Sequence, residues 1–555
     1  MICNKRIVTD ILNQRLRIAL NLLVLAFIAV ALMLPNRISA ITSSAFLCLP
    51  LEPFLLGLLL LIPGRTGRGL LVIAAGLLAT GLIAKVADMA AYQVFERPFN
   101  PVLDARFPAD GMHLLRGAIG EIGAWLVASL MVALLIGIFL LMHAALVRTQ
   151  TLLRVSAKGC GAGLLVGLGL WTALAFGGWQ RATRPLYDLM ATHVGNTLSS
   201  LADLENFNGV VDSDPYASVP DGALFDKLKG KDVLLVFIES YGRTVLDKAD
   251  YAAYIRPLLG KSSADLTANG LSARSAYLTS PTYGGISWLA HGTLLSGLWI
   301  NSQTRYDRLV MSQRPSLNHL FRRAGWRTVA VEPAHTMAWP QGAYFGYDQI
   351  YAAQDLGYRG QPFNWITMPD QYTLSAFQAL ERKPDARQSV MAEIALISSH
   401  APWTPLPQLV DWHQVADGTI FNQAREGDTP EAVWQYTERI REQYRKSIEY
   451  ALANIVSYAI TYGDENLVIL VLGDHQPAPF VTGESESRDV PVHLISRDPK
   501  VMEAVKDWRW TDGMLPAGDA PVWGMDKLRE RFIAAFSHST ADITRLGQMR
   551  AAQRE

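Results

Sequence analysis

Cysteine is scarce in this chain of 555 residues, and all three cysteines, Cys3, Cys48 and Cys160, lie in the first third. The rest of the chain contains none, which excludes a disulfide framework and a thiolate metal site there. The chain also lacks a net charge, because 50 basic residues balance 50 acidic residues. A polyanionic partner such as nucleic acid is therefore not expected. No internal repeat is evident, and the length exceeds that of one ordinary domain.

Hydrophobic residues make up 50% of the chain, and their excess is concentrated before residue 180. A helical membrane span needs about 20 predominantly apolar residues. Five apolar stretches are candidates: residues 18–34, 46–62, 70–84, 122–142 and 161–179. Glu52 and Pro53 interrupt the second stretch, and Lys85 closes the third. Buried helices of a soluble domain are the alternative, but five stretches in series with few charges favour membrane spans.

The loops between these stretches predict the orientation of the chain in a bacterial inner membrane. Lys and Arg are denser in residues 5–17, 65–68 and 148–158 than in the alternate loops, which predicts a cytoplasmic N-terminus. The first span lacks a small-residue cleavage site, so a signal peptide is not expected. Five spans would place the remainder of the chain in the periplasm. Because ATP is absent there, substrates would have to be pre-activated or lipid-linked.

These observations predict four parts of the chain. A five-span membrane domain comprises residues 1–180, and a juxtamembrane linker follows at 181–230. An extracytoplasmic domain comprises residues 231–545, and a polar tail comprises 546–555. Within the linker, residues 186–204 fit either an amphipathic helix lying on the membrane or a plain connecting helix.

Short apolar runs alternate with helical patterns after residue 231. The predicted strands are residues 233–238, 328–331, 392–397 and 467–472, and the predicted helices include 316–324 and 432–461. This alternation predicts an α/β domain with a mostly parallel central sheet and helices on both faces. In such sheets, ligands bind at the carboxyl ends of the strands.

Two of the predicted strands end in residues that bind metals. Residues 233–238 are followed by Glu239, and residues 467–472 lead to Asp474 and His475. Carboxylate and imidazole suit Mn²⁺, Zn²⁺ or Mg²⁺. An isolated Asp-His pair is more often part of a structural turn. Its place at the same sheet edge as Glu239 favours a metal site.

The segment 280–297 supplies a candidate nucleophile. Gly284 and Gly285 permit a close backbone approach, and Ser287 then begins an amphipathic helical pattern. By itself Ser287 fits a helix N-cap. Beside a metal ion the same hydroxyl becomes a nucleophile. Thr282 is the nearest alternative hydroxyl.

Four segments together carry a family resemblance. They are Glu239 after the first strand, Gly284-Gly-Ile-Ser287 leading to Leu294-Leu-Ser-Gly297, Ser398-Ser-His-Ala-Pro-Trp403, and Gly473-Asp-His-Gln476. In this order they resemble the alkaline phosphatase/sulfatase superfamily. With the five-span anchor, the chain resembles its lipoteichoic acid synthase and phosphoglycerol transferase branch, from the spans to about residue 500. The resemblance implies an alkaline-phosphatase-like domain holding one divalent metal, with Mn²⁺ favoured and Zn²⁺ or Mg²⁺ possible, on Glu239, Ser287, Asp474 and His475.

The sequence departs from the family pattern in two places. Sulfatases carry Cys-x-Pro-x-Arg where this chain reads Ser287-Trp-Leu-Ala-His291, so the formylglycine precursor is missing and a sulfatase mechanism is disfavoured. In the stretch from His335 to Gln341, Trp339 matches the family's headgroup-binding Trp. Gln341 replaces the family's Arg and supplies no charge, which leaves phosphoglycerol specificity open. His335 and Arg243 are the candidates to compensate.

His400 matches the substrate-side histidine of the family and is expected to bind phosphate or to act as a general acid. A loop histidine without a catalytic role is the alternative, and a structural role is expected for His493. The resemblance implies a transferase that moves a phosphoglycerol-type headgroup from a membrane phospholipid to a glycan or glycolipid, through a phosphorylated Ser287. The alternatives are a phosphoethanolamine transferase, a phosphate or sulfate ester hydrolase, and a non-catalytic membrane scaffold.

Overall fold

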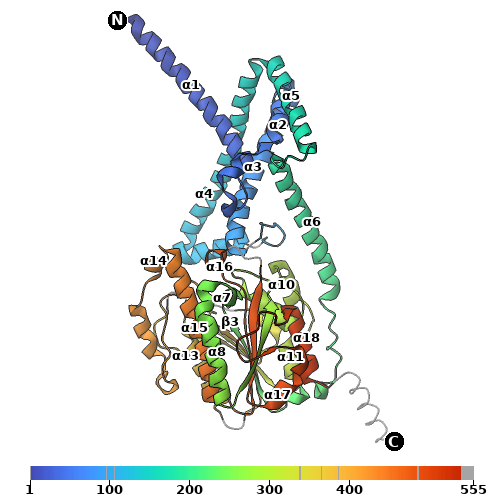
Figure 1. Cartoon of the computed structure of the whole chain (residues 1–555), viewed down its shortest axis with the longest axis vertical. Helices are drawn as coiled ribbons and strands as arrows, with labels where there is room; N and C mark the ends of the chain where they lie inside the picture. The colour runs from blue at the N-terminus through green and yellow to red at the C-terminus, as the bar shows by residue number, and fades with distance from the viewer. Residues whose placement is uncertain are drawn as a thin grey trace, which may run out of the picture. The chain divides into compact units, whose positions relative to one another are not determined.

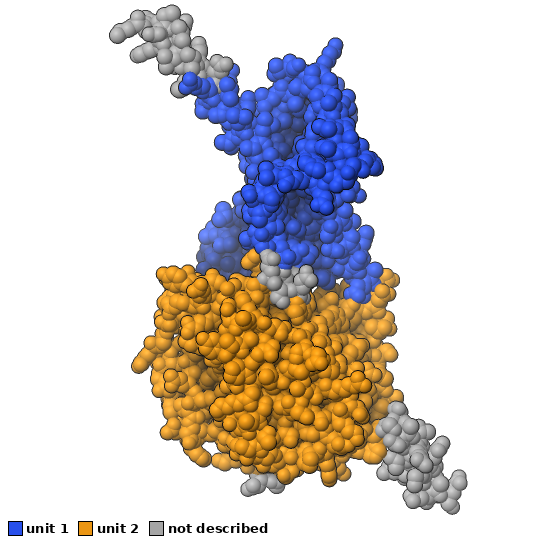
Figure 2. All heavy atoms as spheres, in the orientation of Figure 1, with its two compact units in different colours: residues 1–92, 97–203 blue, residues 93–96, 204–555 orange. Residues whose placement is uncertain are grey.

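The computed structural model describes residues 2–95, 97–105, 107–336, 339–363, 366–384, 387–483 and 487–538. The predicted polar tail, 546–555, lies outside the described residues. The chain divides into two compact units, one of residues 1–92 and 97–203, the other of residues 93–96 and 204–555 (Figure 2). The first unit is helical and the second contains a large sheet.

The first unit consists mainly of long apolar helices. Its helices are α1 (Ile2–Met33), α2 (Glu52–Leu60), α3 (Gly64–Phe95), α4 (Phe107–Arg154), α5 (Ala157–Phe176) and α6 (Pro185–Val210). In the described chain, four of them, α1, α3, α4 and α5, are long and apolar enough to cross a membrane. Within α4 the backbone departs from helical geometry at Gly120, where the predicted fourth span begins. The structure therefore bears out a helical membrane domain.

The second predicted span forms the shortest of these helices, the nine-residue α2. At 1.5 Å per residue this helix is about 14 Å long, roughly half the thickness of a bilayer's hydrocarbon core. Pro53 lies in its first turn, where proline is tolerated. Pro63 and Gly64, which has φ 78°, separate it from α3. Both ends of the apolar stretch are thus outside the helix.

The two charged residues that interrupt the apolar pattern have local partners. Glu52 Oε1 accepts the backbone N–H groups of Leu186 at 2.8 Å and Tyr187 at 3.2 Å, which satisfies the N-terminus of α6. Lys85 is buried within α3, and its ammonium donates to the Leu32 carbonyl at 2.6 Å. Since α1 ends at Met33, this lysine satisfies a carbonyl that has no intrahelical partner.

The second unit is built on one sheet, which has nine strands in the described residues (Figure 1). The strands are β3 (Asp232–Ile238), β4 (Ser272–Thr279), β5 (Arg327–Glu332), β6 (Gln349–Ala352), β7 (Val390–Leu396), β8 (Leu467–Gly473), β9 (Asp489–Ser496), β10 (Thr511–Asp512) and β11 (Val522–Gly524). Their order is β10-β4-β9-β8-β3-β7-β5-β6, with β11 also paired to β4. The central strands β8, β3, β7, β5 and β6 are parallel, whereas β9 is antiparallel to β8 and β4. The predicted mostly parallel sheet is confirmed.

Helices cover both faces of this sheet, as predicted. In Figure 1, α8 (Ala249–Ala268) and α15 (Thr437–Tyr462) lie on one side of β3, and α11 (Leu317–Arg323) and α18 (Met525–Phe536) lie on the other. The remaining helices are α7 (Thr244–Asp247), α9 (Ser287–Ser296), α10 (Gln303–Val310), α12 (Gly342–Phe345), α13 (Asp370–Phe377), α14 (Pro430–Val433), α16 (Pro479–Thr482) and α17 (Pro499–Ala504). Every residue of β3, β7 and β8 is buried, which accounts for their continuous apolar runs.

Candidate active site

Strand register brings the predicted metal ligands together. β3 and β8 are parallel neighbours, with Ile238 opposite Gly473, so Glu239 and Asp474 leave the sheet at the same edge. His475 Nε2 lies 3.3 Å from Glu239 Oε1 and 3.7 Å from Asp474 Oδ2. One ligand atom from each of the three residues lies within 4.8 Å of the others.

The surrounding hydrogen bonds leave one ligand atom of His475 and one of Asp474 available for a metal. His475 Nδ1 donates to the Gln476 carbonyl at 2.8 Å, which leaves Nε2 of the neutral ring as an acceptor. Asp474 Oδ1 accepts the backbone N–H groups of Ser240 and His475, each at 2.7 Å, so its Oδ2 remains for a cation. This donor set of two carboxylates and one imidazole fits Mn²⁺, Zn²⁺ or Mg²⁺.

The electrostatics of the three groups also fit a cation. Burial, and after it the charge of Glu239, raises the pKa of Asp474 to about 7. Burial opposes a charged His475, but Asp474 and Glu239 outweigh it and raise the pKa of that imidazole to about 9. Burial also opposes ionisation of Glu239, yet His400 and His475 hold its pKa well below the usual range. Two carboxylates this close repel each other, and a divalent cation would relieve that repulsion.

Ser287 is positioned against these ligands by an unusual backbone. Ile286 precedes the ten-residue helix α9 in the left-handed region, with φ 63° and ψ 46°. A β-branched residue adopts this conformation only at an energetic cost, which the surrounding structure must offset. Ser287 is the first residue of the helix, and its Oγ donates to Glu239 Oε2 at 2.9 Å. It also lies 3.2 Å from His475 Nε2.

Thr282, the alternative nucleophile, is engaged elsewhere. Its hydroxyl donates to the Gly285 carbonyl at 2.6 Å, and the residue is buried. This hydrogen bond closes the turn that contains Gly284, with φ 71°, and Gly285, with φ 151°. Thr282 therefore shapes the loop that leads to Ser287.

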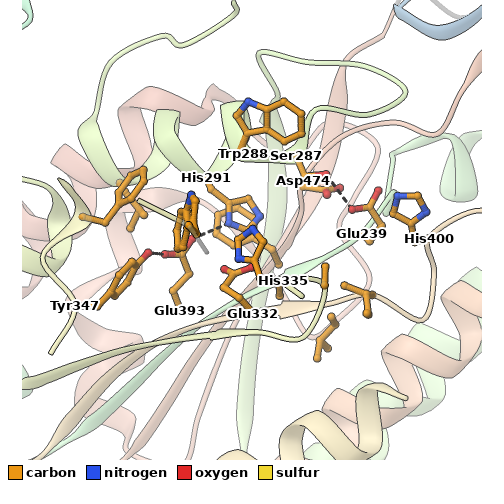
Figure 3. A pocket seen from close by; sticks show the side chains of 18 of the residues that line it. Glu239, Ser287, Trp288, His291, Glu332, His335, Tyr347, Glu393, His400 and Asp474 are labelled. Atoms are coloured by element: carbon orange, nitrogen blue, oxygen red, sulfur yellow. Dashed lines mark hydrogen bonds and ion pairs between the residues drawn. The ribbon is translucent and has the colours of Figure 1, made fainter. Parts of the chain in front are cut away.

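A cavity of about 240 Å³ opens beside Ser287 (Figure 3). Glu239, Asp474 and Ser287 line it, as do the predicted substrate-side residues His335, Trp339 and His400. His400 follows β7, and its Nδ1 donates to the Ala401 carbonyl at 2.7 Å.

Gln341 lies apart from the cavity. It is the N-cap residue of α12 and is not among the described residues that line the cavity. Arg243 is engaged with Asp247 at 2.9 Å and Asp489 at 3.2 Å, and it too is absent from the described lining. Of the two candidates to replace the family's Arg, the structure brings only His335 to the cavity.

A second polar cluster in the same cavity was not predicted. Glu393 on β7 accepts from His291 Nδ1 at 2.7 Å and from the hydroxyl of Tyr347. Glu332, at the end of β5, completes a group whose ligand atoms lie within 4.8 Å of one another. Burial disfavours a charged His291, but the hydrogen bond and charge of Glu393 raise its pKa above the usual value. One sequence signal was available, because Glu393 interrupts a fully buried apolar strand.

Comparisons with known proteins found a matching family model and several similar solved structures. A family model described as Sulfatase matches residues 231–495. Curated proteins gave no match. Among solved structures, the chain is similar to the lipoteichoic acid synthase LtaP from Listeria monocytogenes, with 15% identity over 61% of this chain and 78% of that chain, and a TM-score of 0.34.

Two further solved structures are similar to the chain. The first is the Streptococcus pyogenes phosphoglycerol transferase GacH in complex with sn-glycerol-1-phosphate, with 12% identity over 61% of this chain and 81% of that chain, and a TM-score of 0.33. The second is the C-terminal periplasmic domain of EcEptC from Escherichia coli in complex with Zn, with 16% identity over 48% and 72%, and a TM-score of 0.32.

Proposed function

We propose that residues 231–495, a domain of the sulfatase/alkaline phosphatase superfamily, are the catalytic part of a membrane-bound, metal-dependent phosphotransferase. The transferase moves the phospho-headgroup of a membrane phospholipid to a hydroxyl of a glycan or glycolipid. The contact of the Ser287 hydroxyl with Glu239 and His475 carries the proposal, because this hydroxyl would be the nucleophile and these two residues would bind the metal. The four long apolar helices of the chain support a lipid donor.

Glu239, Asp474 and His475 would hold the metal, with Ser287 as a further ligand. Once bound, a divalent ion supplies positive charge that favours the serine alkoxide and stabilises charge on phosphate oxygens. Mn²⁺ is the favoured ion by family resemblance, and Zn²⁺ and Mg²⁺ suit the same donors. The other contributions come from the chain itself.

In the first half-reaction, Ser287 Oγ attacks the phosphorus of the lipid phosphodiester. A bond forms between Oγ and phosphorus, the bond from phosphorus to the diacylglycerol oxygen breaks, and the headgroup phosphate stays on the serine. The free N–H groups at the start of α9 face phosphate oxygens and stabilise their charge. His400 protonates the departing alcohol.

In the second half-reaction, an acceptor hydroxyl attacks the phosphoserine, and Ser287 Oγ leaves. Deprotonated His400 takes the proton of the attacking hydroxyl, so the histidine returns to its starting state. Water in place of this acceptor would make the protein a hydrolase. By resemblance the headgroup is phosphoglycerol, with phosphoethanolamine as the alternative.

Covalent trapping tests the nucleophile. Purified full-length protein with Mn²⁺ is incubated with vesicles that contain phosphatidylglycerol and phosphatidylethanolamine labelled with ³²P. We expect phosphate label on the wild-type chain and on Thr282→Val, and none on Ser287→Ala. Label that persists on Ser287→Ala, or disappears from a folded Thr282→Val, contradicts the assignment. The absence of label from the wild-type chain and of lipid turnover contradicts the transferase itself.

A further inference from the structure

Aromatic side chains enclose the part of the cavity that holds the second polar cluster. Tyr306, Trp339, Phe345 and Tyr347 all line it. The ring centroid of Trp339 lies 5.8 Å from that of Phe345 and 6.2 Å from that of Tyr347. Aromatic faces carry partial negative charge and attract cations.

The charged residues of the cavity add to this negative character. Four carboxyl groups, those of Glu239, Glu332, Glu393 and Asp474, line the cavity. None of the described lining residues is Lys or Arg. Glu239 and Asp474 belong to the proposed metal site, which leaves Glu332 and Glu393 to attract a cation against the opposing group His291, whose pKa Glu393 raises.

Glu332 is the carboxyl of this cluster for which the described residues provide no hydrogen-bond donor. Glu393 is already satisfied by His291 and Tyr347. Glu332 is only 7% exposed, and in the described part of the chain its carboxyl makes no hydrogen bond. Burial raises the pKa of Glu332 to about 8, with the charge of His291 lowering it and the charge of Glu393 raising it. A buried carboxyl without a partner is unfavourable, and a bound cation would supply that partner.

His335 provides a second unused acceptor nearby. Its backbone N–H donates to the Glu332 carbonyl at 3.0 Å, so the two residues share one turn at the end of β5. Both side chains line the cavity, and Figure 3 shows them directed toward the same region as His291. The ring of His335 lies 4.8 Å from that of Trp339, and its Nδ1 is buried without a hydrogen-bond partner in the described structure. Burial, and after it the charge of His291, lowers its pKa, and a neutral imidazole nitrogen can accept a hydrogen bond.

We propose that Glu332, His335 and the surrounding aromatic rings form a subsite for a primary ammonium, and that Glu332 selects phospholipids with an ethanolamine-type headgroup. An ammonium offers N–H donors to the carboxyl and the imidazole and pairs its charge with Glu332. A glycerol headgroup has hydroxyls but no charge, so it offers Glu332 no ion pair. The inference rests on the proposed transferase function and names its donor.

Direct binding tests the subsite independently of turnover. Full-length, Mn²⁺-loaded protein is titrated by calorimetry with O-phosphorylethanolamine and with sn-glycerol 3-phosphate. We expect the ammonium ligand to bind roughly 10- to 100-fold more tightly, as for a hydrogen bond to a charged group. Glu332→Gln keeps the size of the side chain but should abolish this preference. Glu503→Gln makes the same change at an exposed site on α17 and should retain it.

Turnover of the two labelled phospholipids in mixed vesicles separates the inference from the function on which it rests. Preferential use of phosphatidylethanolamine, with a ratio that falls at least about tenfold in Glu332→Gln, supports both. Preferential use of phosphatidylglycerol, or equal loss of both activities in the variant, overturns the subsite and leaves the transferase intact. If neither lipid is used, the transferase fails, and the binding ratio alone decides whether the subsite stands. Equal binding of the two ligands to wild-type protein overturns it.

Discussion

Metal affinity should depend steeply on pH, because the buried ligands bind protons unusually tightly. The pKa of Asp474 is about 7 and that of His475 about 9 in the metal-free site. Both groups must lose their protons before they can ligate a metal. As the pH falls from 8 to 6, protons therefore compete with the metal at two positions at once.

The expected magnitude follows from these two values. Between pH 8 and pH 6, competition at Asp474 and His475 should lower the apparent affinity about 1000-fold, or roughly 4 kcal/mol. With the ordinary pKa values of 3.8 and 6.5 for the two groups, the same change of pH would lower it only about fourfold. The steeper fall in affinity reflects the burial of the two groups and their interaction with Glu239 and with each other.

Competition titration with a fluorescent chelator measures this dependence directly. Apparent Mn²⁺ affinity is determined for the full-length protein at pH 6, 7 and 8 and constant ionic strength. Ser287→Ala should retain the steep dependence, since it removes neither group that takes up a proton. His413→Gln, which removes an exposed histidine elsewhere, should also retain it. A fall of less than about tenfold between pH 8 and 6 would refute the reasoning about the ligands.

Three further predictions concern the stability and orientation of the sheet-containing unit. Asp232→Asn should lower the free energy of unfolding by about 3–5 kcal/mol in urea, because it breaks a buried ion pair to Arg382 at 2.9 Å and another to Arg387 at 2.7 Å. Burial lowers the pKa of His493 to about 3, so only the unfolded chain binds this proton between pH 6.5 and 3. As the pH falls through this range, the free energy of unfolding should therefore decrease by about 1.4 kcal/mol per pH unit. His493→Asn should remove that contribution. A cysteine introduced as Lys506→Cys, at an exposed site, should react with a membrane-impermeant maleimide in intact cells.

Each of these predictions has an outcome that contradicts it. An unchanged urea midpoint in Asp232→Asn would mean that the arginines find other partners. An unaltered dependence of stability on pH in His493→Asn would mean that the imidazole is protonated in the folded state. Labelling of Lys506→Cys only after permeabilisation would reverse the predicted orientation. Labelling of the parent protein measures the background from Cys3, Cys48 and Cys160.

Local patterns were sufficient for the central strands and failed for the outer ones. β3, β7 and β8 are buried on both faces, so each is a continuous apolar run that the sequence displays directly. β4 and β9 mix apolar residues with Ser, Arg, Asp, Pro and His, and their antiparallel pairing depends on partners about 210–220 residues away. The second apolar stretch, residues 46–62, forms a shorter helix than its composition predicted. Its composition suited a span, but Pro53 and Pro63 restrict the helix to α2.

The sequence by itself determined the parallel core and predicted a metal centre, because Glu239 and the Asp474–His475 pair each follow an apolar strand. Strands of this kind align at one edge, so local order is enough to bring their terminal residues together. Only the tertiary structure decided which hydroxyl faces these ligands, since Ser287 and Thr282 share one loop and differ in backbone direction. Only the tertiary structure also revealed that no described residue donates a hydrogen bond to the Glu332 carboxyl.

The polar cluster around Glu393 shares no sequence pattern, because its members come from separate elements. His291 lies on α9, Glu332 ends β5, Tyr347 precedes β6, and Glu393 lies within β7. Their meeting depends on how helices and strands pack across about 100 residues of chain, which no periodicity records. The same packing left Gln341 outside the cavity. The proposed metal ligands could thus be predicted from the sequence, whereas the proposed headgroup subsite depends on the fold.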